Sequence, residues 1–375
     1  MRIGFDAKRF FNNFTGLGNY SRFVVEALSH HYPENEYWLY TPKARQHADV
    51  DALLQLSNVK TKLPSAVVAP LKLGSIWRSM HVAKLAHRNG VQLFHGLSNE
   101  LPLSIPKDLK TVVTIHDLIF KRYPQFYNPV DVRIYSWKFH EACLSADRIV
   151  AISQQTKEDI MHYLNISEDK IDVIYQGCHP IFKKEYSAEE QARVKQKYQL
   201  PAEFILNVGT IESRKNALAI VKAIVAANIT LPLVIVGKAT LYLRQVQEFI
   251  EQHKLSNQVI FIHTVQFLDL PMIYRAAKVF VYPSLFEGFG IPVVEAIASG
   301  VQVITSTGSC FSEAGGPDCL YADPTNHEQL GDAMQTVLSN SDQSKKMIER
   351  SSQYIQRFEP KVIATDLMRV YSELV

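Results

Sequence analysis

The sequence has few cysteines and no long apolar stretch. No two of its four cysteines, Cys143, Cys178, Cys310 and Cys319, have the C-x-x-C spacing of a zinc or redox site. We therefore expect buried free thiols, which are typical of a reducing compartment. No apolar run approaches the roughly 20 residues of a membrane span. No apolar leader follows Met1, so we expect a cytoplasmic protein without a secretion signal.

Net charge is also small, because 40 Lys and Arg face 37 Asp and Glu in 375 residues. Such a mild excess argues against a dedicated nucleic-acid binder. Residues 1–180 carry 21 basic and 17 acidic side chains, a balance that suits an anionic acceptor or a membrane surface. Segment 70–90 mixes Trp77 and Met80 with Arg78 and Lys84. It predicts an amphipathic helix that either packs on the first lobe or touches a bilayer.

Short apolar, β-branched runs alternate with amphipathic segments along the whole chain, a pattern typical of βα units with parallel sheets. The strands are expected at 2–6, 36–41, 59–63, 91–97, 111–118, 148–153, 171–177, 204–209, 232–237, 259–263, 279–284, 301–306 and 319–323. A polar stretch at 178–200 separates two similar halves. We predict an α/β protein with two Rossmann-like parallel-sheet domains, 1–180 and 181–358, that face each other across a cleft. A final helix at 359–375 could cross back to the first domain.

Ligands of parallel α/β sheets bind beyond the carboxyl ends of the strands, so the residues there are the candidates. In the first half, Gly16 and Gly18 open a helix whose amides could hold a phosphate, or they could simply form a tight turn. His116 and Asp117 end the strand 111–118. They could contact a sugar, or they could brace the turn that follows the strand.

A second polar loop of the first half, HGLSNELP at 95–102, follows another apolar strand. Its polar side chains are His95, Ser98, Asn99 and Glu100. Such a set suits the recognition of sugar hydroxyls, although an ordinary polar loop is the alternative.

In the second half, VGTIESRKN at 208–216 places Gly209 after a strand and Arg214 and Lys215 at the start of a helix. Two cations beside a helix N-terminus make a strong site for an anion, although a solvated helix start is the alternative.

The segment PSLFEGFGIPVVEAIASG at 283–300 carries the most specific pattern. Glu287 lies in a loop, and Glu295 lies about one turn into the helix that Pro292 opens. The amides of Phe289, Gly290 and Ile291 form the N-terminus of that helix. Carboxylates bind hydroxyls and helix N-termini bind phosphates, and a nucleotide sugar carries both groups.

With these motifs in this order, the chain resembles the retaining glycosyltransferases of the GT-B architecture, in the large family-four group of group 1 glycosyltransferases. The E-x7-E segment from Glu287 to Glu295 is the most specific part of the resemblance. HGLSNELP followed by VVTIHDL is most similar to bacterial polysaccharide mannosyltransferases.

The resemblance implies a role for each candidate in the second half. Lys215 and Arg214 would neutralise the donor diphosphate, Glu295 would bind the ribose, and Glu287 would hold the donor sugar together with the nearby helix amides. Val265 would contact the base through its backbone. Many relatives have arginine directly after Gly209, where this sequence has Thr210.

In the first half, which would bind the acceptor, Gly16 and Gly18 would approach the diphosphate and His116 would lie near the reacting centre. His95, Ser98, Asn99, Glu100 and Asp117 are the acceptor-side candidates. We expect no metal, because protein cations would take the place of a divalent ion.

The expected function is transfer of a hexose, mannose by preference, from a nucleotide sugar to a glycan or polyprenyl-linked acceptor. The product would be a cell-surface polysaccharide. GDP-mannose is the expected donor and a UDP-sugar the alternative. The protein would need no other cofactor and would bind no nucleic acid. It would work in the cytoplasm or on the inner face of the plasma membrane. The alternative functions are a nucleotide-sugar epimerase with a related two-lobed fold, or a non-catalytic carbohydrate-binding protein.

Overall fold

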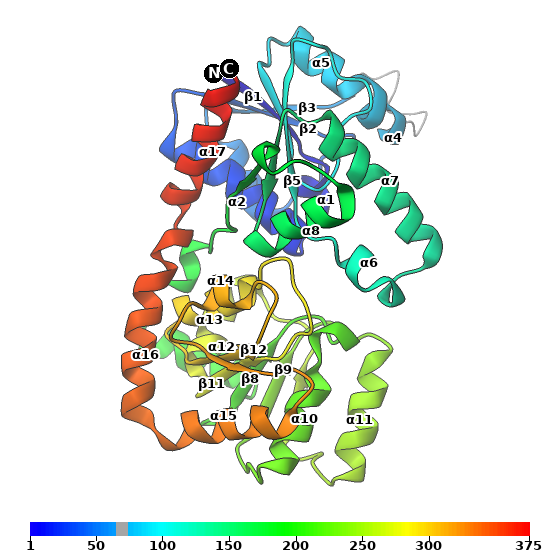
Figure 1. Ribbon diagram of the computed structural model, residues 1–375. Coiled ribbons are helices and arrows are strands. Elements are labelled where there is room, and N and C mark those ends of the chain that lie inside the picture. Colours follow the sequence, from blue (N-terminus) through cyan, green and yellow to red (C-terminus); the bar gives the residue numbers. More distant parts are fainter. Residues whose placement is uncertain (65–73) are drawn as a thin grey trace. The chain divides into compact units, whose positions relative to one another are not determined.

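The computed structural model describes residues 1–64 and 74–375 (Figure 1). Residues 70–73 of the predicted segment 70–90 therefore lie outside the described residues. Backbone contacts divide the chain into two compact units. Unit 1 comprises Met1–Gly177 and Phe358–Val375, and unit 2 comprises Cys178–Arg357.

Unit 1 is built on a parallel sheet of seven strands in the order β3-β2-β1-β4-β5-β6-β7. The strands are β1 (Arg2–Asp6), β2 (Glu36–Tyr40), β3 (Val59–Lys62), β4 (Leu93–Gly96), β5 (Lys110–Ile115), β6 (Arg148–Ala151) and β7 (Ile171–Val173). All seven predicted strands are confirmed. Most end one to four residues earlier than predicted, because their last predicted residues already belong to the loops that follow the strands.

The helices of unit 1 cover its sheet. They are α1 (Lys8–Asn12), α2 (Gly16–His31), α3 (Ala48–Leu54), α4 (Gly74–Ile76), η1 (Trp77–His81), α5 (Val82–Arg88), α6 (Ile119–Arg122), α7 (Pro129–Ser145), α8 (Gln154–Leu164) and α17 (Pro360–Leu374), with short helical turns η2 (Pro124–Phe126) and η3 (Glu168–Lys170). Ser153 caps α8 by accepting a hydrogen bond from the Thr156 amide. The C-terminal helix α17 lies beside α2 (Figure 1).

Unit 2 is built on a parallel sheet of six strands in the order β10-β9-β8-β11-β12-β13. The strands are β8 (Ile205–Val208), β9 (Leu233–Val236), β10 (Val259–Ile262), β11 (Val279–Tyr282), β12 (Val303–Ser306) and β13 (Leu320–Ala322). Every residue of β9 and β11 is buried. This explains their continuous apolar sequences, since helices cover both faces of a parallel sheet.

The helices of unit 2 are α9 (Ala188–Lys197), α10 (Ala217–Ala226), α11 (Tyr242–Gln252), α12 (Leu270–Ala276), α13 (Ile291–Ala298), α14 (Phe311–Gly315), α15 (His327–Ser339) and α16 (Ser341–Tyr354), with turns η4 (Pro180–Phe182), η5 (Ser213–Lys215), η6 (Phe267–Asp269) and η7 (Ile355–Phe358), the last of which reaches Phe358 of unit 1. Their apolar faces and the sheet enclose one large core cluster that includes Ile220, Val246 and Val281.

Strand order reverses at one point in each sheet, between β1 and β4 in unit 1 and between β8 and β11 in unit 2. At such a switch point neighbouring loops leave the carboxyl edge in opposite directions and open a crevice. In unit 2 the flanking loops are the one that contains Lys215 and the one that contains Glu287. In unit 1 they follow Asp6 of β1 and Gly96 of β4.

Residues 74–88 are helical, and two side chains of this segment pack or pair within unit 1, as the first of the two alternatives predicts. Trp77 is buried in a core cluster, and Arg78 forms ion pairs with Asp6 and Glu100. Ile76 and Met80 remain exposed. Among the described residues, none of the helices combines the length and the apolarity that crossing a bilayer requires.

The structure corrects one expectation about the glycines of α2. Neither Gly16 nor Gly18 has a positive φ, so the tight-turn alternative is wrong. A Cβ on Gly18 would lie 1.7 Å from the backbone oxygen of Asn13, whereas a Cβ on Gly16 would meet nothing within 4 Å. The chain requires glycine at position 18 because another backbone segment passes there.

Replacing Gly18 with alanine should therefore destabilise unit 1 by about 1–3 kcal/mol, the usual cost of overpacking. Gly16→Ala is the matched control and should leave stability unchanged or raise it by up to about 1 kcal/mol, because alanine is the better helix former. Urea unfolding followed by circular dichroism measures both. Equal midpoints for the two variants would contradict the close approach of Asn13.

Candidate functional site

The carboxylate of Glu287 is held by three groups of unit 2. Its Oε1 accepts hydrogen bonds from the hydroxyls of Tyr282 (2.7 Å) and Ser284 (3.1 Å) and lies 2.8 Å from Nη1 of Arg214. Its side chain is only 14% exposed. Burial alone would raise the pKa of Glu287, but the charges of Arg214 and Lys215 outweigh burial and hold this pKa below its usual value. Glu287 is therefore ionised at neutral pH.

Arg214 has little binding capacity left. Besides Glu287, its guanidinium pairs with Glu212 at 2.7 Å and donates to the backbone oxygen of Phe286 at 2.5 Å. The backbone oxygen of Arg214 also accepts from the Leu285 amide at 2.8 Å. Arg214 thus fixes the loop that carries Glu287.

Glu295 lies in the second turn of α13 and has a different environment. Its Oε2 accepts a hydrogen bond of 3.1 Å from the buried hydroxyl of Tyr274. Burial raises the pKa of Glu295 to about 7, although Tyr274 and Lys215 both act to lower it. Near neutral pH a large fraction of this carboxyl is therefore protonated.

The positive charge of Lys215 acts on both glutamates, because it lowers the pKa of Glu287 and of Glu295. Its Nζ lies 5.7 Å from the ring centroid of Tyr282, a cation–π distance. In the described part of the chain no ion pair or side-chain hydrogen bond engages Lys215. A Cβ on Gly209 would come within 2.9 Å of Lys215 Nζ, so the glycine leaves space for this ammonium group.

The N-terminus of α13 lies between the two glutamates in the sequence. Gly290 is its N-cap with a φ of 90°, a left-handed conformation that favours glycine, and no side chain caps the helix. The amides of Phe289, Gly290 and Ile291 come from this turn. Val265 is half-buried in the loop after β10, and no described contact joins it to the glutamates.

Sequence reasoning missed Tyr274, Tyr282, Ser284 and Glu212. Tyr282 and Ser284 belong to the predicted strand 279–284, VFVYPS, which leads into the segment of the two glutamates. A tyrosine at the end of a buried strand needs a hydrogen-bond partner for its hydroxyl, and this requirement could have indicated the contact between Tyr282 and Glu287. Tyr274 gave no such signal, because it lies on α12, a helix that the motif does not include.

In unit 1, His116 is buried and both of its ring nitrogens have partners. Nε2 lies 2.9 Å from the backbone oxygen of Leu97, and Nδ1 lies 3.3 Å from the side-chain amide of Gln176. Tyr20 of α2 packs edge-on against the ring at 4.6 Å. Burial lowers the pKa of His116 to about 4, and the bond to Leu97 offsets part of that shift. The imidazole is neutral at pH 7.

The expectation for His95 needs correction, because its side chain is completely buried. Nδ1 lies 2.6 Å from the hydroxyl of Tyr371 on α17, and Nε2 lies 2.9 Å from the hydroxyl of Thr114. Burial and the nearby His116 lower the pKa of His95 to about 3. His95 therefore joins α17 to the core of unit 1 and has no surface to offer an acceptor.

The other acceptor-side candidates are buried or have hydrogen-bond or ion-pair partners within unit 1. Asn99 has a φ of 63° and accepts from the His116 amide at 2.7 Å. Ser98 is buried, and Asp117 accepts from the Ile119 amide at 3.1 Å. Glu100 is partly exposed and lies between Arg78 at 2.5 Å and Lys138 at 3.2 Å.

The structure thus brings together Arg214, Lys215, Gly209 and the two glutamates around the switch point of unit 2. In unit 1 it brings His116 together with His95, Asn99 and α2. The described residues contain no group of three or more His, Cys, Asp or Glu side chains placed to hold a metal ion. The four cysteines are free and buried, as expected.

Two family models match the chain. Residues 17–180 match the glycosyltransferase family 4 model, and residues 188–354 match the model for glycosyl transferases group 1.

Several bacterial proteins are similar in sequence. O-antigen chain mannosyltransferase B of Escherichia coli is 29% identical over 64% of this chain and 63% of its own length. The serotype-specific mannosyltransferase WbdA of Escherichia coli is 32% identical over 67% of this chain and 32% of its own length. O-antigen chain mannosyltransferase RfbU of Salmonella typhimurium is 29% identical over 68% of this chain and 67% of its own length. The chain thus spans less than two thirds of the first two relatives.

Solved structures share the fold of the chain. Sucrose-phosphate synthase from Thermosynechococcus elongatus aligns with a TM-score of 0.76 at 18% identity and covers 100% of this chain and 99% of its own. HepE of Anabaena in complex with UDP aligns with a TM-score of 0.74 at 16% identity and covers both chains fully. The fold is therefore the GT-B architecture, with two parallel-sheet α/β domains.

The raised pKa of Glu295 predicts a pH-dependent stability of unit 2. The folded protein holds this proton up to about pH 7, whereas an ordinary glutamate loses it near 4.5. Between these values the folded state binds more protons, so the free energy of unfolding falls as pH rises through that window. Glu295→Gln should remove on the order of 1–3 kcal/mol of this fall.

Urea unfolding at pH 5 and pH 8 provides the measurement, and Glu251→Gln on the exposed face of α11 is the control. The same pH dependence in wild type and Glu295→Gln would show that Glu295 titrates normally.

Proposed function

Because this chain belongs to the glycosyltransferases of group 1 and family 4, we propose that it transfers a hexose from a nucleotide sugar to a glycan or polyprenyl-linked acceptor. The hexose is mannose, the donor is GDP-mannose, and the anomeric configuration is retained. The product is a cell-surface polysaccharide assembled on the cytoplasmic side of the membrane. One observation carries the proposal: the ammonium group of Lys215, which has no ion-pair partner in the described residues, acts electrostatically on two glutamates whose carboxyl groups accept hydrogen bonds from buried tyrosines.

Each carboxylate uses one oxygen internally and keeps the other free in the described residues. Tyr282, Ser284 and Arg214 all bind Oε1 of Glu287, and Tyr274 binds Oε2 of Glu295. Oε2 of Glu287 and Oε1 of Glu295 can therefore accept hydrogen bonds from hydroxyl groups of a ligand. We assign the first to the donor sugar and the second to the nucleotide ribose. Val265 is assigned to the base.

Lys215 and the N-terminus of α13 supply positive charge for the diphosphate. When the bond between the sugar C1 and the phosphate oxygen breaks, the electron pair stays on that oxygen and charge develops on the leaving group. A fixed ammonium group and helix amides stabilise this charge without reorganisation. Arg214 contributes indirectly, because it holds Glu287 and its loop in position. These two roles are compatible with Thr210, at the position where many relatives have arginine, because the proposal requires no second cation there.

His116 and the acceptor side belong to unit 1. A neutral His116 with both ring nitrogens engaged serves to position the loop of Asn99 and not as a charged acid. Gly16 and the amides at the start of α2 face a phosphate in this proposal. Glu100, ionised and partly exposed, is the acceptor-side group with capacity for a sugar hydroxyl, whereas Ser98 and Asp117 support the loops.

The names of the relatives support mannose, because three of them are mannosyltransferases. UDP in the structure of HepE supports a UDP-sugar as the alternative donor. Retention is inferred from the family alone, and the reaction proposed for it is a front-face one in which the departing phosphate accepts the proton of the acceptor hydroxyl.

Lys215→Ala should lower kcat/KM for hexose transfer by about 100-fold or more, in line with the loss of one group that stabilises the developing charge. Lys346→Ala, an exposed lysine of α16 in the same unit, is the control and should leave activity unchanged. Transfer from radiolabelled GDP-mannose to an acceptor glycan measures both variants. Equal rates would rule out the assigned role of Lys215.

The anomeric outcome is a separate prediction. NMR of the product should show the same anomeric configuration as the donor, and an inverted product would exclude the front-face reaction. The donor incubated alone should not isomerise. Isomerised donor would identify the protein as an epimerase. Donor binding without any transfer would identify it as a carbohydrate-binding protein.

A further inference from the structure

Helix α7 of unit 1 carries apolar side chains on two opposite faces. One face contributes Phe139, Ala142 and Cys143 to the core. On the opposite face, Val130, Ile134, Trp137 and Leu144 are between 44% and 61% exposed. Steps of four, three and seven residues place these four side chains in one line along the helix. We call this line the outer stripe.

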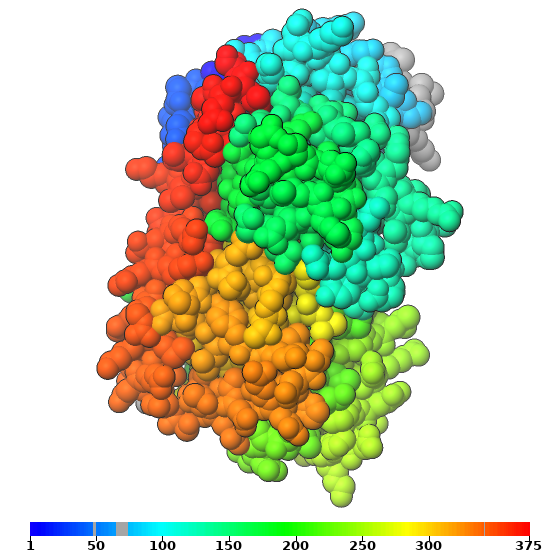
Figure 2. Space-filling model, in the orientation of Figure 1, coloured from blue at the N-terminus to red at the C-terminus, as the bar shows by residue number. Residues whose placement is uncertain are grey.

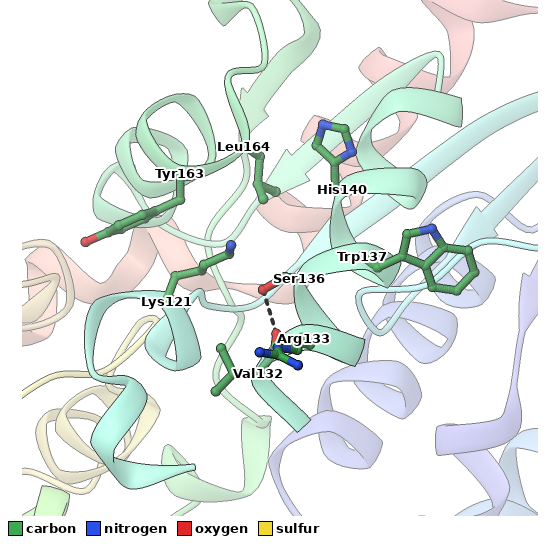
Figure 3. Close-up of a pocket in the computed structure, with 8 residues that line it drawn as sticks. All are labelled: Lys121, Val132, Arg133, Ser136, Trp137, His140, Tyr163 and Leu164. Atoms are coloured by element: carbon green, nitrogen blue, oxygen red, sulfur yellow. Dashed lines mark hydrogen bonds between the residues drawn. The ribbon is translucent and has the colours of Figure 1, made fainter. Parts of the chain in front are cut away.

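Basic side chains flank the outer stripe. At 3.6 residues per turn, Arg133 and His140 lie on one side of it and Lys138 lies on the other. Arg133, His140 and Trp137 line an open hollow of about 550 Å³, together with Lys121 of α6 (Figure 3). Figure 3 shows the indole of Trp137 directed away from Tyr163. No ion pair engages Lys121 or Arg133 in the described residues.

Apolar side chains outside α7 extend the stripe. Leu103 is exposed and its amide donates to the backbone oxygen of Ser79 at 2.7 Å. Ser79, Leu103 and Trp137 line a second, smaller hollow. Met80, next to Ser79, is exposed as well. In Figure 2 the teal atoms of the α7 region lie at the surface. The shared hollow therefore places Leu103 beside Trp137 of the outer stripe.

An apolar surface beside two unpaired cations, Lys121 and Arg133, matches one environment best. Apolar side chains flanked by Lys and Arg favour the interface of a bilayer that contains anionic phospholipids. One carboxylate, Glu141, interrupts the stripe, and its Oε1 lies 4.0 Å from Nδ1 of His140. We propose that the outer stripe with Met80 and Leu103 docks on a bilayer surface, where Lys121 and Arg133 bind the phosphates of anionic lipids.

This docking surface goes beyond the proposed transfer reaction and does not rest on it. It places the membrane contact mainly on α7, with Met80 contributing from segment 70–90, whereas Trp77 and Arg78 of that segment are engaged internally. In this arrangement unit 1 would bring the acceptor side of the enzyme to the membrane.

Co-sedimentation with vesicles tests the proposal. The wild-type protein should pellet with vesicles of phosphatidylcholine and phosphatidylglycerol at low salt, and much less with phosphatidylcholine alone. Ile134→Ser together with Trp137→Ser should lower the partition coefficient about tenfold or more, because two large apolar side chains no longer enter the interface. The double variant Lys121→Ser with Arg133→Ser should lower the partition coefficient about fivefold for each charge removed. This loss should occur only at low salt.

The control is Leu241→Ser, since Leu241 is 82% exposed in unit 2, and it should bind vesicles like wild type. Thermal unfolding keeps the test interpretable, because exposed substitutions should not shift the melting temperature. Wild-type protein that fails to pellet with anionic vesicles would overturn the proposal. So would a dimer in size-exclusion chromatography that Trp137→Ser dissociates, because a second copy would then cover the stripe.

Discussion

The ion pair between Arg214 and Glu287 is the interaction on which the candidate site depends. Two charges buried together are costly unless their remaining hydrogen bonds are satisfied, and here Tyr282, Ser284, Glu212 and the Phe286 carbonyl satisfy them. The pair fixes the loop before α13 relative to the loop after β8, which are the two loops that flank the switch point of unit 2. It also leaves Lys215 without an ion-pair partner in the described residues, so a structural contact and the candidate binding group are neighbouring residues of one turn.

The fold could be predicted from the sequence because its periodicity is a local property. All thirteen strands lie where the apolar runs are, and Pro292 opens α13 as its position indicated. The spacing of Glu287 and Glu295 placed one in the loop and one in the helix. The partner of Arg214 could not be predicted in the same way, because it comes from a loop about 70 residues away. A basic residue at a helix start looks identical whether it binds a ligand or a buried carboxylate.

The same limit explains the histidines of unit 1. A polar residue near the end of a strand can face solvent or the core, and sequence alone does not decide between them. His95 faces the core, where its bond to Tyr371 joins α17 to unit 1, which no local pattern could reveal. The outer stripe of α7 is the reverse case. Spacing alone does not distinguish its apolar residues from core residues, and the structure shows that a second apolar face of α7 packs on the core.

The central claim is that unit 2 binds a nucleoside diphosphate sugar through Lys215 and through the carboxyl oxygens of Glu287 and Glu295 that have no partner in the described residues. Isothermal titration calorimetry with GDP-mannose, GDP, GMP and UDP tests it most directly. The account predicts that GDP-mannose and GDP bind, that affinity weakens with added salt, and that GMP, which lacks the second phosphate, binds at least tenfold more weakly. Equal affinity for GMP and GDP, or no heat with any of these ligands, would contradict it.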